Sequence, residues 1–177
     1  MRPVGRREHR RTDSHNVPAL ARRFGDTLRV GDGGAAERVI EEALGLELSP
    51  VAVQSLIIAP AMARIGELWE AGAISVADEH LATAISQRVL VRLFEALTVA
   101  RPRSRERILL AAVEGQHHTL GLRMVADVLE GSGFEVMFLG ADVPVESLRG
   151  FASQYQPAVT GLAFGIAANI GCLADSI

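Results

Sequence analysis

The spacing of hydrophobic residues predicts helices between residues 34 and 99. One helix is expected over residues 34–46. Ser49 followed by Pro50 is typical of a helix start, with the serine as the cap and the proline at the first helical position. The stretch that they open runs to about Gly72, and Pro60 should kink it or divide it in two.

A longer helix is expected from Ser75, which caps it, to about Val99. Acidic residues Asp78 and Glu79 fall in its first turn, where the helix dipole favours negative charge. Its apolar stripe should face the core of a helical bundle and consists of Leu81, Ala84, Ile85, Val89, Leu93 and Leu97.

The pattern changes after residues 101–105, a polar segment with a proline that we interpret as a domain linker. Short apolar runs now alternate with helical patterns. Strands are expected over residues 108–113, 135–139 and 158–164, and helices over 118–130 and 145–155. This alternation predicts a doubly wound parallel sheet. Three strands leave exposed edges, so we expect an α/β domain that is truncated at its C-terminus, or one whose edge a partner covers.

Charge is distributed unevenly over a chain whose net charge is −3. Residues 1–30 hold eight arginines and three acids, a net of +5, and the remainder holds ten arginines and eighteen acids, a net of −8. We interpret residues 1–30 as a disordered basic arm, residues 31–103 as a helical domain and residues 104–177 as the α/β domain. The arm could touch nucleic acid or an acidic partner, but it lacks a helix-turn-helix pattern, so we expect no direct DNA binding.

Composition further restricts the class of protein. Cys172 is the single cysteine, which excludes an internal disulfide and fits a cytoplasmic protein. We expect no membrane span, because no uninterrupted apolar run is long enough to cross a bilayer.

The loop between the first predicted strand and its helix carries the clearest candidate chemistry. It reads Gln116-His117-His118-Thr119-Leu120-Gly121 and lies at the carboxyl end of a strand, where open α/β sheets bind ligands. Neutral imidazole is a common ligand of transition metals, so His118 is a candidate metal ligand. Gly121 would allow the helix to pack closely against whatever covers the loop. The alternative is that both histidines cap the helix or face water.

A second group of candidates lies in the helical domain. Val76, Glu79, His80 and Thr83 form one stripe at helical spacing, and Trp69 ends the preceding helix. Together they suit a ligand with a flat apolar part and hydrogen-bonding edges. The alternative is a buried tryptophan beside a solvated Glu-His pair.

These two segments resemble a known family over about residues 35–177. The run from Trp69 to Thr83 is similar to the helical cap motif of cobalamin-binding regulators, the CarH-like light sensors. The run from Gln116 to Gly121 is similar to their B12 loop. The resemblance implies a four-helix-bundle cap followed by a flavodoxin-like B12-binding domain, with the corrin between the two and its benzimidazole tail displaced into the α/β domain.

The resemblance also implies a role for each candidate residue. His118 would be the lower axial ligand of cobalt, and Trp69 would cover the upper face. The upper ligand, adenosyl rather than methyl, would be surrounded by Val76, Glu79 and His80. Further contacts to the cofactor would come from Gln116, His117 and Gly121.

The sequence departs from the family pattern at several positions. Gln116 replaces an acid that would orient the ligating ring and raise its basicity, so we expect weaker cobalt–histidine coupling than in enzymes that cycle cobalt. Glu70 stands where some light sensors have a second histidine. Ala163 and Gly165 replace hydroxyl residues that would contact the nucleotide tail.

These residues favour a cobalamin sensor that is not an enzyme and that acts through a homo-oligomer or a transcription-factor partner, with light as one candidate signal. The alternative is a corrinoid protein that carries methyl groups for a methyltransferase. Heme in place of cobalamin, or a degenerate pocket that binds nothing, also remains open.

Overall fold

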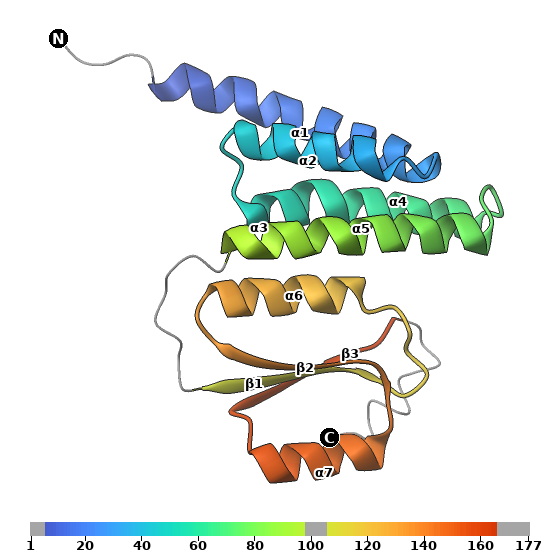
Figure 1. Ribbon diagram of the computed structural model, residues 1–177, viewed down its shortest axis with the longest axis vertical. Helices are drawn as coiled ribbons and strands as arrows, with labels where there is room; N and C mark the ends of the chain where they lie inside the picture. Colours follow the sequence, from blue (N-terminus) through green and yellow to red (C-terminus); the bar gives the residue numbers. More distant parts are fainter. Residues whose placement is uncertain (1–5, 98–105, 166–177) are drawn as a thin grey trace. The chain divides into compact units, whose positions relative to one another are not determined.

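The computed structural model describes residues 6–97 and 106–165 of the chain (Figure 1). It divides into two compact units, Met1–Leu93 and Phe94–Ile177, and each is described by itself. The expected linker at residues 101–105 and the single cysteine, Cys172, lie outside the described residues.

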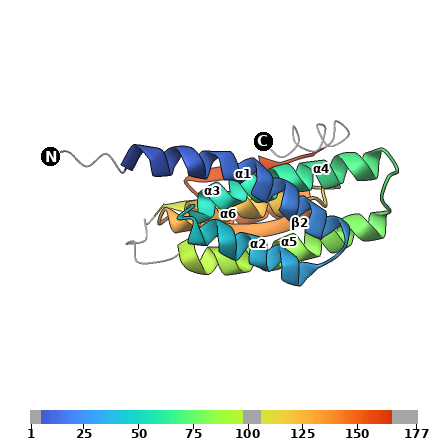
Figure 2. The same cartoon turned by 90° about the horizontal axis from the view of Figure 1, so that it is seen from above.

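The first unit is helical. Its elements are α1 (Arg6–Arg29), α2 (Gly33–Gly45), α3 (Pro50–Val53), η1 (Gln54–Ile58), α4 (Ala59–Glu70) and α5 (Val76–Leu97). Because α3, η1 and α4 follow one another without a gap, they form one continuous helical stretch, and α1 packs against α2, η1 and α4 (Figures 1 and 2). The expected helical bundle is therefore confirmed.

Helix α1 corrects the prediction of a disordered arm over residues 1–30. Leu20, Phe24 and Leu28 recur every four residues and are almost completely buried, so they hold the second half of α1 in the bundle. The stripe is only one residue wide, and arginines such as Arg22 and Arg23 separate its members in the sequence. The high charge of the segment therefore concealed a regular helical pattern, and the prediction was wrong here.

The stretch that opens at Ser49 begins as predicted. The Ser49 hydroxyl accepts a hydrogen bond from the Ala52 amide at 3.2 Å, and Pro50 occupies the first turn. The expected irregularity near Pro60 takes the form of the π-helical turn η1, in which the Ala59 amide donates to the Gln54 carbonyl five residues back. Proline lacks an amide hydrogen, and the wider turn beside it accommodates that loss without breaking the helix.

The same stretch bears on the expectation that no membrane span is present. The helical residues Pro50–Glu70 are long and apolar enough to cross a bilayer by length and composition alone. This is weak evidence for a membrane span, because core helices of bundles share these properties. Val53, Ile57 and Ile65 are indeed buried within the helical unit.

The buried face of α5 differs from the predicted stripe. Ile85, Val89 and Leu93 are buried as expected, but Leu81 is 49% exposed and Ala84 is also exposed. The remaining buried positions are Ala82, Ser86 and Leu90. The core face is therefore rotated relative to the predicted stripe. It includes Ser86, whose hydroxyl donates to the Met62 sulfur at 3.2 Å, a contact that apolar spacing alone does not reveal.

The second unit is a doubly wound α/β sheet, as predicted. Its elements are β1 (Arg107–Val113), α6 (Leu120–Gly131), β2 (Glu135–Val143), α7 (Val145–Tyr155) and β3 (Val159–Ala163). The strands are parallel in the order β2-β1-β3, and α6 and α7 cover opposite faces (Figure 1). Strand β1 is therefore central. Ile108 packs toward α6 and Leu109 toward α7, so both faces of the strand are buried.

We predict that Phe24→Ala lowers the free energy of unfolding by about 3–5 kcal/mol, because it removes a fully buried aromatic ring. Val30→Ala is the control, since Val30 is 77% exposed and should change stability by no more than about 0.5 kcal/mol. Urea unfolding followed by circular dichroism measures both. Equal stability of the two variants would show that α1 does not belong to the bundle.

Candidate functional site

The loop after β1 is built on a tight turn. The Gln116 amide donates to the Val113 carbonyl at 2.9 Å, and Gly115 between them has a φ of 79°. A positive φ at this third position is typical of a type II turn, and glycine adopts it without steric cost. The turn directs the following residues away from the carboxyl end of the sheet's central strand.

Gln116 faces inward and is only 4% exposed. Its side-chain oxygen accepts a hydrogen bond from the His118 backbone amide at 3.2 Å, and its amide nitrogen lies directly against Gly165, where any side chain would displace it. Gln116 therefore holds the backbone of His118. In the family pattern, an acid at this position would orient the ligating ring. Here the Gln116 side chain bonds to the His118 main chain instead.

Asp142 ties the end of β2 to the same loop. Its side-chain oxygen Oδ1 accepts a hydrogen bond from the Gly115 amide at 2.8 Å, and its own amide donates to the Gln116 carbonyl at 3.0 Å. Sequence reasoning missed this residue. The available signal was an aspartate at the end of the neighbouring parallel strand, because both strand ends meet at one edge of the sheet.

His117 and His118 are both exposed, and within the described residues neither ring makes a hydrogen bond or ion pair. Helix α6 begins at Leu120, so both histidines belong to the loop rather than to the helix start expected at residue 118. A side-chain carbon placed on Gly121 would meet nothing within 4 Å in the described structure. The loop thus presents imidazole nitrogen on an open surface.

The described residues contain no group of three or more His, Cys, Asp or Glu side chains that could hold a metal ion. An isolated metal ion would therefore find too few ligands here. A metal whose other positions are filled by its own macrocycle needs only one or two protein donors. The donor set of the loop fits such a cofactor.

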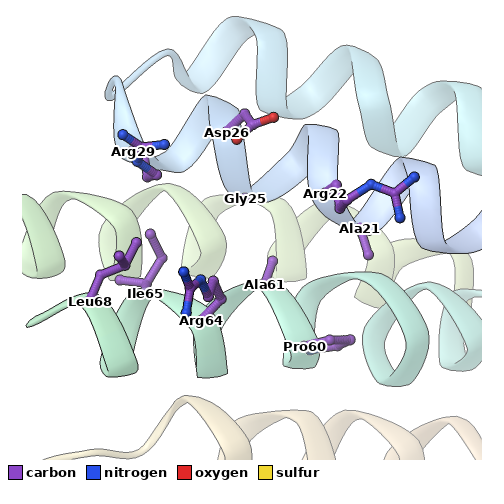
Figure 3. A pocket seen from close by; sticks show the side chains of 10 residues that line it. All are labelled: Ala21, Arg22, Gly25, Asp26, Arg29, Pro60, Ala61, Arg64, Ile65 and Leu68. Atoms are coloured by element: carbon purple, nitrogen blue, oxygen red, sulfur yellow. The ribbon is translucent and has the colours of Figure 1, made fainter. Parts of the chain in front are cut away.

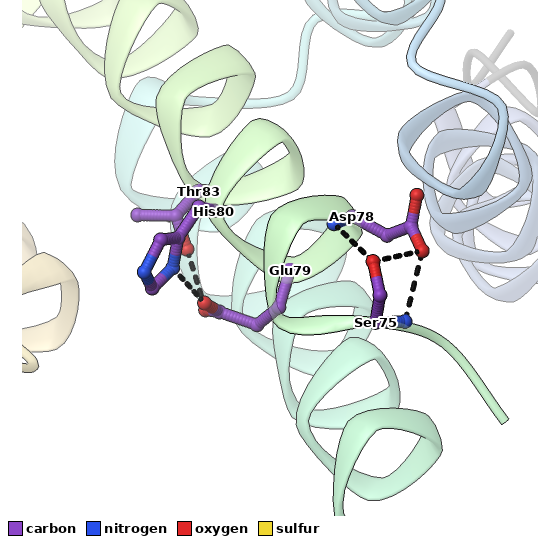
Figure 4. A network of polar contacts seen from close by, with 5 residues as sticks. All are labelled: Ser75, Asp78, Glu79, His80 and Thr83. Carbon is purple, nitrogen blue, oxygen red and sulfur yellow. Dashed lines mark hydrogen bonds and ion pairs between the residues drawn. The ribbon is translucent and has the colours of Figure 1, made fainter. Parts of the chain in front are cut away.

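In the helical unit, Glu79, His80 and Thr83 form a hydrogen-bonded cluster (Figure 4). Glu79 Oε2 contacts His80 Nδ1 at 2.6 Å, and Glu79 Oε1 accepts from the Thr83 hydroxyl at 2.8 Å. The Glu79 side chain is 13% exposed and that of His80 is 73% exposed. The structure thus joins three of the four predicted stripe residues, with the carboxylate in the middle.

The start of α5 fixes the position of this cluster. Asp78 accepts hydrogen bonds from the Ser75 amide at 2.8 Å and the Ser75 hydroxyl at 2.7 Å, while the hydroxyl accepts from the Asp78 amide at 3.2 Å (Figure 4). These bonds, first from the hydroxyl and then from the backbone, lower the pKa of Asp78. The cap therefore stabilises the helix above the unfolded pKa of this carboxyl and weakens as the pH falls through its folded value.

Trp69 and Val76 lie on either side of the turn that joins α4 to α5. They are 45% and 53% exposed, so the alternative of a buried tryptophan does not hold in this structure. Both side chains expose apolar surface, and both lie within ten residues of Glu79 in the sequence. Of the predicted site residues, Trp69, Val76, Glu79 and His80 belong to the helical unit, and Gln116, His117, His118 and Gly121 belong to the α/β unit.

A groove of about 380 Å³ also lies in the helical unit, between α1 and α4 (Figure 3). Its apolar side chains include Ala61, Ile65 and Leu68, and its charged ones are Arg22, Asp26, Arg29 and Arg64. None of the candidate site residues predicted from the sequence lines it. The groove is therefore separate from both candidate clusters.

Comparison with known protein families identifies both units. Two family models match, each described as a B12 binding domain, one over residues 20–93 and the other over residues 106–175. The first begins inside α1, in agreement with the place of that helix in the bundle.

Similar curated proteins fall into two groups. The HTH-type transcriptional repressors CarA and CarH of Myxococcus xanthus are each 31% identical to this chain, over 82% and 88% of its length. Trimethylamine corrinoid protein 1 of Methanosarcina acetivorans is 27% identical over 76% of this chain and 63% of its own. This chain spans about half, 48%, of each repressor.

The fold matches a solved structure of the monomethylamine corrinoid protein from Methanosarcina barkeri. The TM-score is 0.78 with 17% sequence identity, over 90% of this chain and 76% of that chain. This chain therefore shares the fold of that protein.

Proposed function

Because the chain belongs to the family of proteins built from B12 binding domains, we propose that it binds a cobalamin with His118 as the lower axial ligand of cobalt. The observation that carries this proposal is the exposed, unengaged imidazole of His118 in a loop at the carboxyl end of β1. Neutral imidazole nitrogen is a good donor for such a metal.

The surroundings of His118 support a bound macrocycle. No group of three or more metal-binding side chains lies among the described residues, and the open face at Gly121 leaves room for a large flat ligand. Bound cobalamin would supply a cobalt–carbon bond whose carbon group can be released or transferred. Heme would also need a single axial nitrogen, but both family models name B12, so cobalamin is the proposed cofactor.

We propose that the helical unit encloses the upper ligand and that this ligand is adenosyl. Trp69 and Val76 offer exposed apolar surface, and His80 offers an exposed ring. The Glu79 carboxylate, held by two neighbouring side chains, provides oxygen acceptors suited to the hydroxyls of a ribose. A methyl group has no hydrogen-bonding edge and would make no use of such acceptors.

We propose further that the protein is a sensor rather than an enzyme and that it acts through assembly or through a transcription-factor partner. Two of its similar proteins, CarA and CarH, are transcriptional repressors. Loss of the upper ligand would remove the contacts that hold Glu79 and Trp69 over the cofactor, which would shift the equilibrium between two arrangements.

The second candidate function is a methyl-carrying corrinoid protein. The similarity to trimethylamine corrinoid protein 1 and the shared fold favour it. Gln116 argues against it, because its side chain is neutral and bonded to the His118 backbone, so it contributes no carboxylate to tune the ligating imidazole.

We predict that His118→Ala weakens cobalamin binding by at least about tenfold and abolishes coordination by a protein nitrogen. The measurement is a cofactor titration followed by visible absorbance, combined with electron paramagnetic resonance of Co(II) in protein labelled with nitrogen-15. A ligand from the protein splits each line into a doublet, whereas the unlabelled base of the cofactor gives a triplet.

His117→Ala is the matched control, since it removes the neighbouring exposed imidazole and should retain the doublet. A doublet that survives in His118→Ala but disappears in His117→Ala would assign the ligand to His117. A wild-type protein that binds no corrinoid would overturn the proposal.

We predict that Glu79→Ala weakens binding of adenosylcobalamin by at least about tenfold and leaves methylcobalamin binding nearly unchanged, because only adenosyl uses a charged acceptor. Isothermal titration calorimetry with both cofactors measures the difference. Glu41→Ala is the control, as it removes a carboxylate from α2 whose side chain is 68% exposed. Equal losses for both cofactors would contradict the proposed contact with adenosyl. Transfer of the methyl group of methylcobalamin to a thiol would separately test the methyl-carrier function.

We predict that illumination of the adenosylcobalamin complex changes both its visible spectrum and its assembly state. Photolysis removes the upper ligand, and the proposed cap then loses its occupant. Absorbance and size-exclusion chromatography with light scattering, in the dark and after illumination, provide the measurement. An unchanged mass alongside a changed spectrum would exclude assembly as the response to light.

A further inference from the structure

We propose that Asp142 is a positioning residue that holds the loop of His118 at a fixed place on the sheet edge. The inference rests on the proposed role of His118 and adds a residue that lies on another strand. Asp142 is exposed, and among the described residues its carboxylate makes no hydrogen bond or ion pair with a histidine ring, so its effect must pass through the backbone of the loop.

The end of β2 is shaped to present Asp142. The pairing of β1 with β2 is regular from Arg107 to Leu110 and then shifts twice, so that Ala111 lies opposite Gly140 and Val113 opposite Val143. Each shift gives β2 an extra residue, as in a β-bulge, and bulges redirect side chains at the ends of strands.

Backbone strain marks the same place. Gly140 has a φ of 82° and Asp142 a φ of 52°. A left-handed conformation is uncommon for a residue with a side chain, although aspartate and asparagine tolerate it better than most. Such conformations persist where surrounding contacts over-determine them, and they are frequent at functional sites.

Two hydrogen bonds account for the strained conformation. The Asp142 carboxylate accepts from the Gly115 amide at 2.8 Å, and the Asp142 amide donates to the Gln116 carbonyl at 3.0 Å. Gln116 in turn accepts from the His118 amide at 3.2 Å through its side chain. An unbroken series of contacts thus links Asp142, through Gln116, to the backbone of His118.

The two bonds made by Asp142 can be separated by mutation. Glycine adopts a positive φ without steric strain and keeps the backbone amide. Asp142→Gly therefore removes only the side-chain acceptor. Asparagine also tolerates the left-handed conformation and keeps an Oδ1 acceptor, so Asp142→Asn should preserve the bond to Gly115.

The experiment compares the wild type, Asp142→Gly and Asp142→Asn by amide hydrogen exchange without cofactor and by the nitrogen-15 resonance assay with Co(II) cobalamin. We expect Asp142→Gly to speed exchange at residues 115–118 by about ten- to a hundredfold, the range for one lost hydrogen bond to a charged group, with β1 unaffected. The doublet from the axial nitrogen should weaken in the same variant, and Asp142→Asn should match the wild type in both readouts.

Unchanged exchange and an unchanged doublet in Asp142→Gly would overturn the proposal, as would an Asp142→Asn protein as defective as the glycine variant. If Asp142→Gly does not fold, hydrogen exchange at the Gly115 amide of the wild type tests the proposal instead. Protection of that amide supports the bond, and exchange at the rate of a free peptide refutes it. A wild type without the doublet would disprove the role of His118, while the exchange data would still test the loop.

Discussion

The candidate site depends on the burial of β1 between two neighbouring strands and two helices. Both faces of this strand are covered, so its register is tightly fixed. The turn at Gly115 must therefore begin at one defined position at the end of the strand. Everything that follows along the chain, from the inward side chain of Gln116 to the exposed ring of His118, takes its place from that turn. A loop on such a support can carry an exposed ligand without being loosely held.

The elements that the sequence revealed are those with a strong local pattern. Alternation of strands and helices located the loop of His118, and Ser49 with Pro50 marked a helix start that the structure contains. The helical stripe from Val76 to Thr83 likewise brought Glu79, His80 and Thr83 into direct contact. In each case the contacts lie within a few residues of one another, which is the range over which periodicity carries information.

Other features escaped for two different reasons. The buried stripe of α1 is local but hidden among arginines, whereas the burial of Ser86 goes with a contact to a methionine sulfur 24 residues away. Asp142 meets Gly115 across 27 residues, and only the parallel pairing of two strands explains the contact. Binding residues from different elements share this difficulty, since each is ordinary in its own segment.

The π-helical turn at residues 54–58 has a consequence for the far end of its helix. Such a turn holds one residue more than an α-helical turn, and each residue of an α-helix advances the direction of the side chain by about 100°. The π turn thus takes up one extra residue within about a single turn, without the further rotation of about 100° that this residue would add in a regular α-helix. Excision of one residue from η1 would restore an α turn and leave the indole of Trp69 facing nearly the same way, whereas the same excision within α4 would turn it by more than a quarter of a circle.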